Sequence, residues 1–333
     1  SISSFNVLIL SNISNLTNFL SFKERTEIDF TASKYSILGK TNVYENEFLK
    51  GALFIGPNAS GKSNALKGLS FIVKMIKGEG AAFQNYRCLF SNNPIITAEY
   101  EFVFDNKKVE YMTEYNIQTN SISENLKIDD ITVLKRAGST GELRIGHKVT
   151  IDDQIDSETL FLRTASFNTG RFPQEPTLRK LMDFLQNSYI VDEYNWDVRT
   201  GKTITKYAEE YGVEKINKYL DSFNYDFFVE YGSESEGAGL KVSLGSGKKA
   251  VFLKRKSYPV PNVLALESQG NQVFADLLPN LIRVIEHTGM LIIDEFGNSL
   301  HNKLAEKIIR FFMENAKDSQ IFITSHDTNL IQF

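Results

Sequence analysis

A glycine-rich segment that follows a short apolar run constrains the fold of this chain more than any other feature. Residues 56–63 read GPNASGKS and come directly after the apolar residues ALFI at 52–55. The segment matches the pattern G-x-x-x-x-G-K-[ST], in which glycines let backbone N–H groups turn toward phosphate oxygens. Residues 62–76 have helical spacing, so the positive end of a helix would face the same phosphate. The sequence therefore predicts a strand–loop–helix unit of an α/β fold.

This loop supplies most of the candidate ligand-binding residues. They are Gly56, Pro57, Asn58, Ala59, Ser60, Gly61, Lys62, Ser63 and Asn64. Lys62 would reach the β- and γ-phosphates of ATP, and the Ser63 hydroxyl would ligate Mg²⁺. Average residue usage gives a chance match in about one chain of this length per hundred, so a plain turn is the less favoured interpretation.

A second apolar run delivers two adjacent carboxylates. Residues 290–293 read MLII, and Asp294 and Glu295 follow. The carboxyl ends of parallel strands are where open α/β sheets bind ligands. We expect Asp294 to hold Mg²⁺ through its water shell and Glu295 to act as general base toward the attacking water. Such a string alone is often only a strand end, but the phosphate loop favours the catalytic interpretation.

Two further motifs follow a fixed order along the chain. ESQGNQ at 267–272 places Ser268 and Gly270 at the start of a predicted helix, where they form either an anion cradle or an ordinary helix cap. FITSHD at 322–327 places His326 at the end of a third buried strand, where it could contact a γ-phosphate. The spacing of about 30 residues after Asp294 favours that role over a strand-end histidine.

The strand signals typical of a parallel sheet lie at the two ends of the chain. We expect strands at 5–10, 26–30, 97–104, 108–117 and 320–324, a hairpin region at 232–256, and helices at 177–188, 203–220, 271–287 (with a possible kink at Pro279) and 301–316. Three parts follow: residues 1–160 as the first part of lobe I, 161–283 as an inserted helical lobe II, and 284–333 as the rest of lobe I.

Composition limits the classes of partner. The net charge is −4, so no overall basic excess indicates nucleic-acid binding. A cluster at 248–256 (Lys248, Lys249, Lys254, Arg255 and Lys256) is either a solvated strand pair, which we favour, or a nucleic-acid or partner contact. The single cysteine, Cys88, excludes disulfides within the chain, and no apolar run approaches the roughly 20 residues of a membrane span. The first ten residues also lack the features of a signal peptide, so we expect a cytoplasmic protein.

The order of the motifs resembles the ATP-binding-cassette head. The chain contains, in this order, the phosphate loop, a helical insertion, S-x-G-x-Q before a helix, four hydrophobic residues followed by Asp-Glu, and a strand-end histidine. More narrowly, the chain resembles the OLD/RecF-like branch of AAA-type ATPases in four segments, which are NFLSFKERTEIDF (18–30), ESQGNQ, IIDEFGNSLHNKL and FITSHDTNL. That branch includes the anti-phage ATPase AbiL and the ATPase subunits AriA of PARIS and PtuA of Septu. The resemblance implies a P-loop α/β fold with a mixed sheet in lobe I.

The resemblance also implies a dimer around ATP. Ser268 and Gly270 would grip the γ-phosphate bound by a second protomer in a homodimer or higher even oligomer, with residues 299–301 as the D-loop and His326 as the switch histidine. The Q-loop does not transfer cleanly, and Asn168 is its weak candidate. Family members continue past the switch histidine, whereas this sequence ends at Phe333 and contains no Toprim or HNH motif.

The function is expected to be ATP hydrolysis that controls a separate effector, such as a nuclease or toxin, in bacterial anti-phage defence by abortive infection. Two alternatives stay open. One is a RecF-like DNA-repair ATPase that binds nucleic acid. The other is a scaffold that binds ATP with little turnover.

Overall fold

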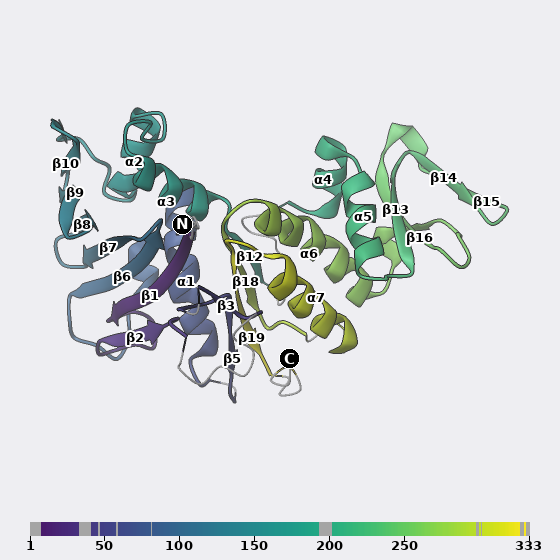
Figure 1. Ribbon diagram of the computed structural model, residues 1–333, viewed down its shortest axis with the longest axis horizontal. Coiled ribbons are helices and arrows are strands. Elements are labelled where there is room, and N and C mark those ends of the chain that lie inside the picture. The colour runs from purple at the N-terminus through teal and green to yellow at the C-terminus, as the bar shows by residue number, and fades with distance from the viewer. Residues whose placement is uncertain are drawn as a thin grey trace, which may run out of the picture.

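The computed structural model describes residues 8–32, 41–45, 47–57, 59–80, 82–192, 202–297, 300, 302–326 and 330. An antiparallel sheet, a parallel sheet and a smaller lobe of helices and strands follow one another along the long axis of the molecule (Figure 1). Among the described residues, no helix combines the length and the hydropathy that crossing a membrane requires.

The antiparallel sheet has the strand order β11-β10-β9-β8-β7-β6-β1-β2. Its strands are β1 (Leu8–Thr17), β2 (Thr26–Asp29), β6 (Ile95–Phe104), β7 (Lys107–Asn116), β8 (Ser121–Ile128), β9 (Ile131–Ala137), β10 (Thr140–Ile145) and β11 (Lys148–Asp152). Buried and half-buried side chains alternate along β8, as expected for a sheet with one face on a core.

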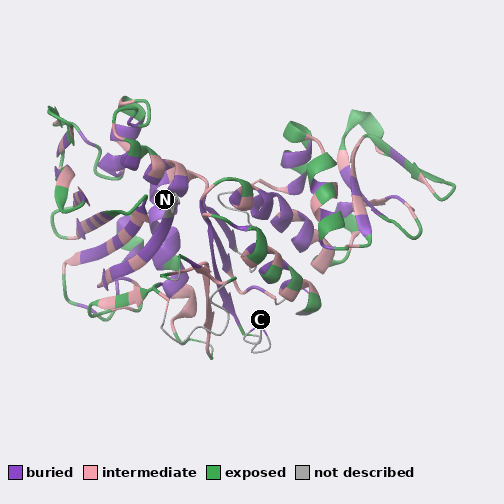
Figure 2. Ribbon diagram, in the orientation of Figure 1, coloured by how far each residue is buried: buried purple, intermediate pink, exposed green. Residues whose placement is uncertain are grey.

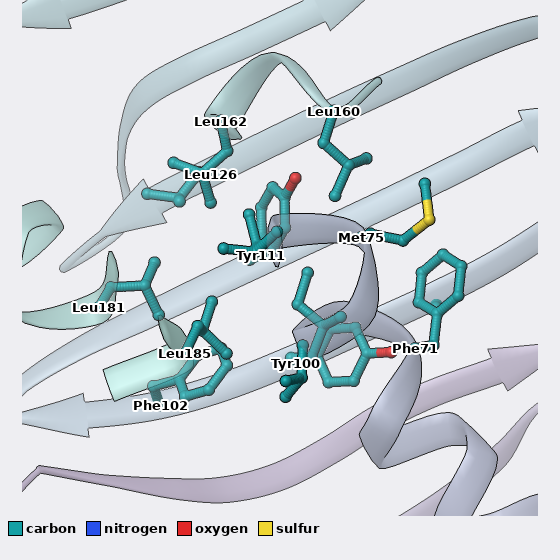
Figure 3. Packing of buried hydrophobic residues seen from close by; sticks show 14 of the residues in the cluster. Phe71, Met75, Tyr100, Phe102, Tyr111, Leu126, Leu160, Leu162, Leu181 and Leu185 are labelled. Atoms are coloured by element: carbon teal, nitrogen blue, oxygen red, sulfur yellow. The ribbon is translucent and has the colours of Figure 1, made fainter. Parts of the chain in front are cut away.

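Three helices cover the buried face of this sheet: α1 (Lys62–Lys77), α2 (Phe161–Asn168) and α3 (Pro176–Gln186). Tyr100 and Tyr111 of the sheet pack with Phe71 of α1 and with Leu181 and Leu185 of α3 in one apolar cluster (Figure 3). Because α2 and α3 share the core of lobe I, we propose that the inserted lobe starts after residue 192 rather than at 161.

The parallel sheet joins the two ends of the chain. Its order is β12-β18-β19-β5, with β12 (Tyr189–Asp192), β18 (Met290–Asp294), β19 (Gln320–Ser325) and β5 (Gly51–Ile55). Met290 and Ile292 of β18 face the cluster around α1, while Leu291 and Ile293 face a second cluster built with α6 and α7. Burial on both faces explains why β18 begins with four apolar residues in succession, whereas the edge strand β5 is half-buried (Figure 2).

The smaller lobe lies beyond α6 at the far end of the molecule (Figure 1). Its elements are α4 (Ile204–Tyr211), α5 (Glu214–Ser222), β13 (Phe227–Gly232), β14 (Glu234–Gly237), β15 (Leu240–Ser243), β16 (Ala250–Arg255) and β17 (Asn262–Val263). α6 (Gln269–Glu286) and α7 (Asn302–Asn315) connect it to the parallel sheet. The remaining elements are β3 (Val43–Tyr44), β4 (Phe48–Leu49) and the 3₁₀ turns η1 (Phe83–Tyr86), η2 (Gly245–Gly247) and η3 (Leu264–Leu266).

One helix prediction needs correction. The single helix expected over 203–220 is two helices, because Gly212 ends α4 with φ 79° and ψ −173°, which no α-helix contains. The helix expected over 271–287 is confirmed as α6, which contains Pro279 and continues as one helix through that residue.

The basic cluster at 248–256 is largely paired with acids. Lys254 is 4% exposed, and its Nζ donates to Glu230 Oε1 at 2.7 Å. Lys256 donates to Asp221, also at the surface of this lobe. Lys248, Lys249, Arg255 and Lys256 are exposed, as the favoured interpretation of a solvated strand pair expects, whereas Lys254 departs from it because it is buried.

A buried ion pair fixes the start of α2. Glu124 of β8 accepts hydrogen bonds from Arg136 Nη1 at 3.2 Å, from the Tyr111 hydroxyl at 2.6 Å and from the backbone N–H groups of Phe161 and Leu162. Both charged side chains are fully buried. Arg136 also donates to three backbone carbonyls, those of Gly138, Asp156 and Thr159. The carboxylate thus caps the positive end of α2 and ties it to the sheet.

One side-chain amide connects the two sheets. Gln320, the first residue of β19, is fully buried. Its Oε1 accepts from Leu10 N at 2.8 Å, and its Nε2 donates to the carbonyls of Leu10 and Leu49, each at 3.0 Å. The amide bonds the backbone as a neighbouring strand would, so β1 and β19 are held together where their sheets meet.

Candidate nucleotide site

The phosphate loop runs from the end of β5 to the start of α1. Gly61 caps α1 in the left-handed conformation, with φ 93°, which glycine adopts without strain. A Cβ at Gly56 would lie 2.8 Å from Ser60 Oγ, so a side chain at this position would force the Ser60 hydroxyl to move. Lys62 Nζ donates to the carbonyls of Gly56 and Pro57, at 2.8 and 2.9 Å. The ammonium is thereby held inside the loop.

A hollow of about 530 Å³ lies over this loop. It is lined by Ser21, Ala59, Ser60, Gly61, Lys62, Ser63, Asn64, Glu295 and His326. Eight of the residues named from sequence motifs therefore surround one space beside the N-terminus of a helix. Asn58 lies outside the described residues. Ser21 was not anticipated from the sequence, although its Oγ would lie only 3.6 Å from a Cβ at Gly61.

The two proposed metal ligands are in contact. Ser63 Oγ donates to Asp294 Oδ1 at 3.1 Å, although the residues belong to α1 and β18. A hydroxyl and a carboxylate oxygen are donors that Mg²⁺ accepts. The observed pair therefore fits the divalent ion that accompanies a nucleoside triphosphate, and the Gly56 curl fits its phosphates.

Glu295 follows Asp294 in an unusual backbone conformation. Its φ is 57°, which costs a non-glycine residue roughly 1–2 kcal/mol. The carboxylate lines the hollow, and its Oε1 lies 4.0 Å from His326 Nε2. The turn thus places the proposed base and the proposed switch histidine side by side.

Thr324 of β19 contacts both carboxylate residues and was missed by motif reasoning. Its Oγ1 donates to Asp294 Oδ1 at 2.5 Å and accepts from the backbone N–H of Glu295 at 2.7 Å. No spacing rule links residue 324 to residues 294 and 295, because the contact arises from the pairing of β18 with β19.

Ser268 and Gly270 occupy a different surface, at the start of α6. Neither lines the hollow over the phosphate loop. Ser268 is the exposed N-cap residue, but within the described part of the chain its hydroxyl makes no hydrogen bond that caps α6. A small polar residue that leaves its helix uncapped keeps its hydroxyl available to another group.

The turn that carries Ser268 is held by Glu267. Its carboxylate accepts from Asn262 Nδ2 at 2.6 Å and from Asn271 Nδ2 at 2.8 Å. Burial alone would raise the pKa of Glu267, but hydrogen bonds from Asn271 and Asn262 outweigh it and the pKa lies below its ordinary value. Gln272 adds a bond to the Glu267 carbonyl at 2.7 Å. The turn therefore presents Ser268 in one orientation.

Residues 52–332 match the family described as "AAA domain, putative AbiEii toxin, Type IV TA system". The chain belongs to this family. Among curated proteins, no sequence matches it.

Similar solved structures define the fold of this AAA-family chain. One is the Smc head with an extended coiled coil bound to the C-terminal domain of ScpA from Pyrococcus furiosus, with 10% identity, TM-score 0.52 and coverage of 98% of this chain and 92% of that one. Another is the SmcHead bound to the C-winged helix domain of ScpA, with 12% identity, TM-score 0.52 and coverage of 97% and 91%. The fold is that of the ABC-type ATPase head.

The other family motifs are less well placed. Of the expected D-loop, Ser299 and His301 lie outside the described residues, and Leu300 is buried. Asn168, the weak Q-loop candidate, is an exposed residue at the end of α2 and does not line the hollow. The individual roles assigned to Lys62, Glu295, His326, Ser268 and Gly270 stay predictions.

Proposed function

We propose that the chain binds ATP with Mg²⁺ over its phosphate loop and hydrolyses it. The observation that carries this proposal is the contact of Ser63, in the first turn of α1, with Asp294, at the end of β18, directly beside the hollow that Ser63 and Glu295 line. The family assignment, an AAA domain, supports it.

Each charged or polar group of the hollow has a distinct task. Lys62 exchanges the carbonyls of Gly56 and Pro57 for phosphate oxygens, which are stronger partners because they are charged. Ser63 and Asp294 would hold Mg²⁺. The ion neutralises charge on the β- and γ-phosphates.

Glu295 and His326 act on the γ-phosphate. As water oxygen bonds to the γ-phosphorus and the bond to the β–γ bridging oxygen breaks, Glu295 accepts the proton from water. His326, 4.0 Å from Glu295, donates to a γ-phosphate oxygen. The products are ADP and phosphate.

We further propose that the site is completed by a second copy of the chain. Ser268 and Gly270 lie outside the hollow of their own chain, and Ser268 is exposed. Two positions before it, the apolar side chain of Leu266 is 77% exposed. A surface with an available hydroxyl and an exposed leucine fits one that is covered when ATP brings two copies together.

The proposed outcome is control of a separate effector in anti-phage defence, within the cytoplasm. The family description names a type IV toxin–antitoxin system, and the two similar Smc heads bind a domain of another protein. An ATPase head that opens and closes on a partner is consistent with both.

Light scattering with and without MgATP tests the dimer. Glu295→Gln keeps the shape of the side chain but removes the base, so this variant should accumulate as a closed dimer with ATP. Adding Ser268→Arg should return it to monomer, because a bulky cation replaces a small hydroxyl at a tight contact. If the Ser268→Arg protein hydrolyses ATP at the wild-type rate, the site is complete within one chain and the dimer proposal fails.

A mixture of two inactive variants is the matched control for a site shared between two copies. Lys62→Ala lacks the phosphate-loop ammonium and Ser268→Arg lacks the opposite half of the site. Each should be inactive alone, and their mixture should recover one working site per heterodimer. Lack of recovery, with both variants folded, would count against sites shared between copies.

A further inference from the structure

Thr324 lies between the two halves of the proposed catalytic apparatus. It belongs to β19, the strand between β18, which leads to Asp294, and β5, which leads to the phosphate loop. Its side chain is 1% exposed. The position is therefore a buried junction beneath the hollow rather than part of its lining.

The direction of both hydrogen bonds follows from the donors available. The backbone N–H of Glu295 can only donate, so Thr324 Oγ1 must accept at that contact, which is 2.7 Å long. The single hydroxyl proton is then directed at Asp294 Oδ1, 2.5 Å away. One hydroxyl thus bonds the side chain of the proposed metal ligand and the backbone of the proposed base at once.

We infer that Thr324 is a positioning residue that holds Asp294 and Glu295 in register for hydrolysis. The inference rests on the proposed ATPase function. A carboxylate rotates broadly about its last torsion, and the Thr324 and Ser63 hydroxyls, both bonded to Oδ1, fix which oxygen is directed toward α1.

The second effect concerns the backbone of Glu295. Its φ of 57° is held by two bonds to one residue, since Glu295 N donates to Thr324 Oγ1 and Phe296 N donates to the Thr324 carbonyl at 2.8 Å. Without the hydroxyl, the turn can relax toward an unstrained conformation. The Glu295 carboxylate would then leave its place in the hollow.

A purely structural role makes a different prediction. A buried hydroxyl that only satisfies the Glu295 N–H would lower thermal stability when removed, but each folded molecule would keep its turnover. The two roles therefore separate when activity per folded molecule is measured alongside stability.

The experiment compares three variants by ATP turnover, by the Mg²⁺ concentration for half-maximal turnover, by binding of a fluorescent ATP analogue and by thermal midpoint. Thr324→Val removes the hydroxyl at nearly constant volume, and Thr324→Ser restores it. Thr113→Val is the matched control, because Thr113 is also buried in a strand, with a hydroxyl bond to the Ala98 carbonyl.

Thr324→Val should bind the analogue with an affinity within about threefold of wild type. It should turn over ATP ~10²-fold more slowly, because a displacement of a catalytic group by about 1 Å lowers the rate by that factor. Its Mg²⁺ requirement should rise about tenfold, since Asp294 loses orientation. Thr324→Ser should recover turnover to within about threefold of wild type, and Thr113→Val should turn over ATP as wild type does.

Equal turnover and Mg²⁺ requirement in Thr324→Val and wild type, with a lower thermal midpoint, would overturn the inference and leave a structural role. Wild-type protein that binds no ATP or does not hydrolyse it contradicts the proposed function instead, so the two failures are distinguishable.

Discussion

At the scale of single residues, we predict that His326 acts in ATP hydrolysis and not in ATP binding. Its Nε2 is close to Glu295 Oε1, and its partly exposed side chain lines the hollow. His326→Ala should bind ATP nearly as wild type does, because the proposed contact is to the γ-phosphate and not to the base or ribose. Phosphate release should slow by ~10²-fold, the effect of losing one preorganised donor.

His147→Ala is the control for this prediction, since His147 is an exposed histidine in the turn between β10 and β11. The measurement is phosphate release at saturating ATP, with analogue binding by fluorescence. An affinity loss in His326→Ala as large as that in Lys62→Ala would show that the histidine is a binding residue rather than a switch.

Candidate site residues were predictable where they are contiguous in the sequence, as in the phosphate loop and the Asp294–Glu295 pair, although their roles stay predictions. In the structure, residues 59–64 and Glu295 line one hollow, and Asp294 contacts Ser63 of the same loop. Ser21 and Thr324 lie within the segments 18–30 and 322–327, but nothing in those segments marked either residue as part of the site. They reach the site through contacts across the fold, with Ser21 against the Gly61 loop and Thr324 against the strand beside its own. A single sequence does not encode those contacts as a pattern.

At the scale of elements, the attachment of α2 depends on one carboxylate. Glu124→Gln leaves Arg136 buried without its counter-charge and removes an acceptor from the start of α2. Breaking one partner of a buried pair costs about 3–5 kcal/mol, so the free energy of unfolding in urea should fall by that amount. Glu142→Gln is the matched control, because its pair with Arg144 is exposed and should cost under about 1 kcal/mol.

An equal, small loss in both variants would mean that the Glu124 network does not bear on the attachment of α2. The clearest contrary outcome is a Glu124→Gln protein whose thermal unfolding is the same as that of wild type.

Element boundaries were predictable only where turn chemistry and period agreed. The apolar runs of β18 and β19 were anticipated because burial on both faces leaves no polar alternation, and the run of β5, a half-buried edge strand, was anticipated because it stops at the phosphate loop. β12 was missed, since its four residues directly follow α3 and read as part of a helical block. Gly212 was the available signal that α4 and α5 are separate helices, but a helical period on both sides concealed it.

At the scale of the whole molecule, the proposed site lies in the middle of an elongated body (Figure 1). Closure of two copies there would move the lobe of α4, α5 and β13–β16 as a lever. If the chain controls an effector in anti-phage defence, as proposed, cells that carry the gene with its native neighbours should resist phage, and Lys62→Ala should abolish that resistance, measured as plating efficiency. Lys148→Ala, in the exposed edge strand β11, should retain it.

Unchanged plating with heightened sensitivity to DNA-damaging agents in the Lys62→Ala strain would favour the DNA-repair alternative. If the strain shows neither phenotype while the purified protein still hydrolyses ATP, both proposed roles are excluded and the ATPase assignment remains in place.

The position of β5 has a consequence for how the protein is made. In the parallel sheet, β5 is the edge strand and its neighbour is β19. Gln320, the first residue of β19, donates to the carbonyl of Leu49, the last residue of β4 just before β5, and the two residues are 271 positions apart. A ribosome adds about 5–20 residues per second, so the phosphate loop waits on the order of tens of seconds for the strand that orders it. Chains released before residue 324 would lack both Thr324 and His326 beside the loop, so we expect a truncated product to lack the proposed ATP hydrolysis.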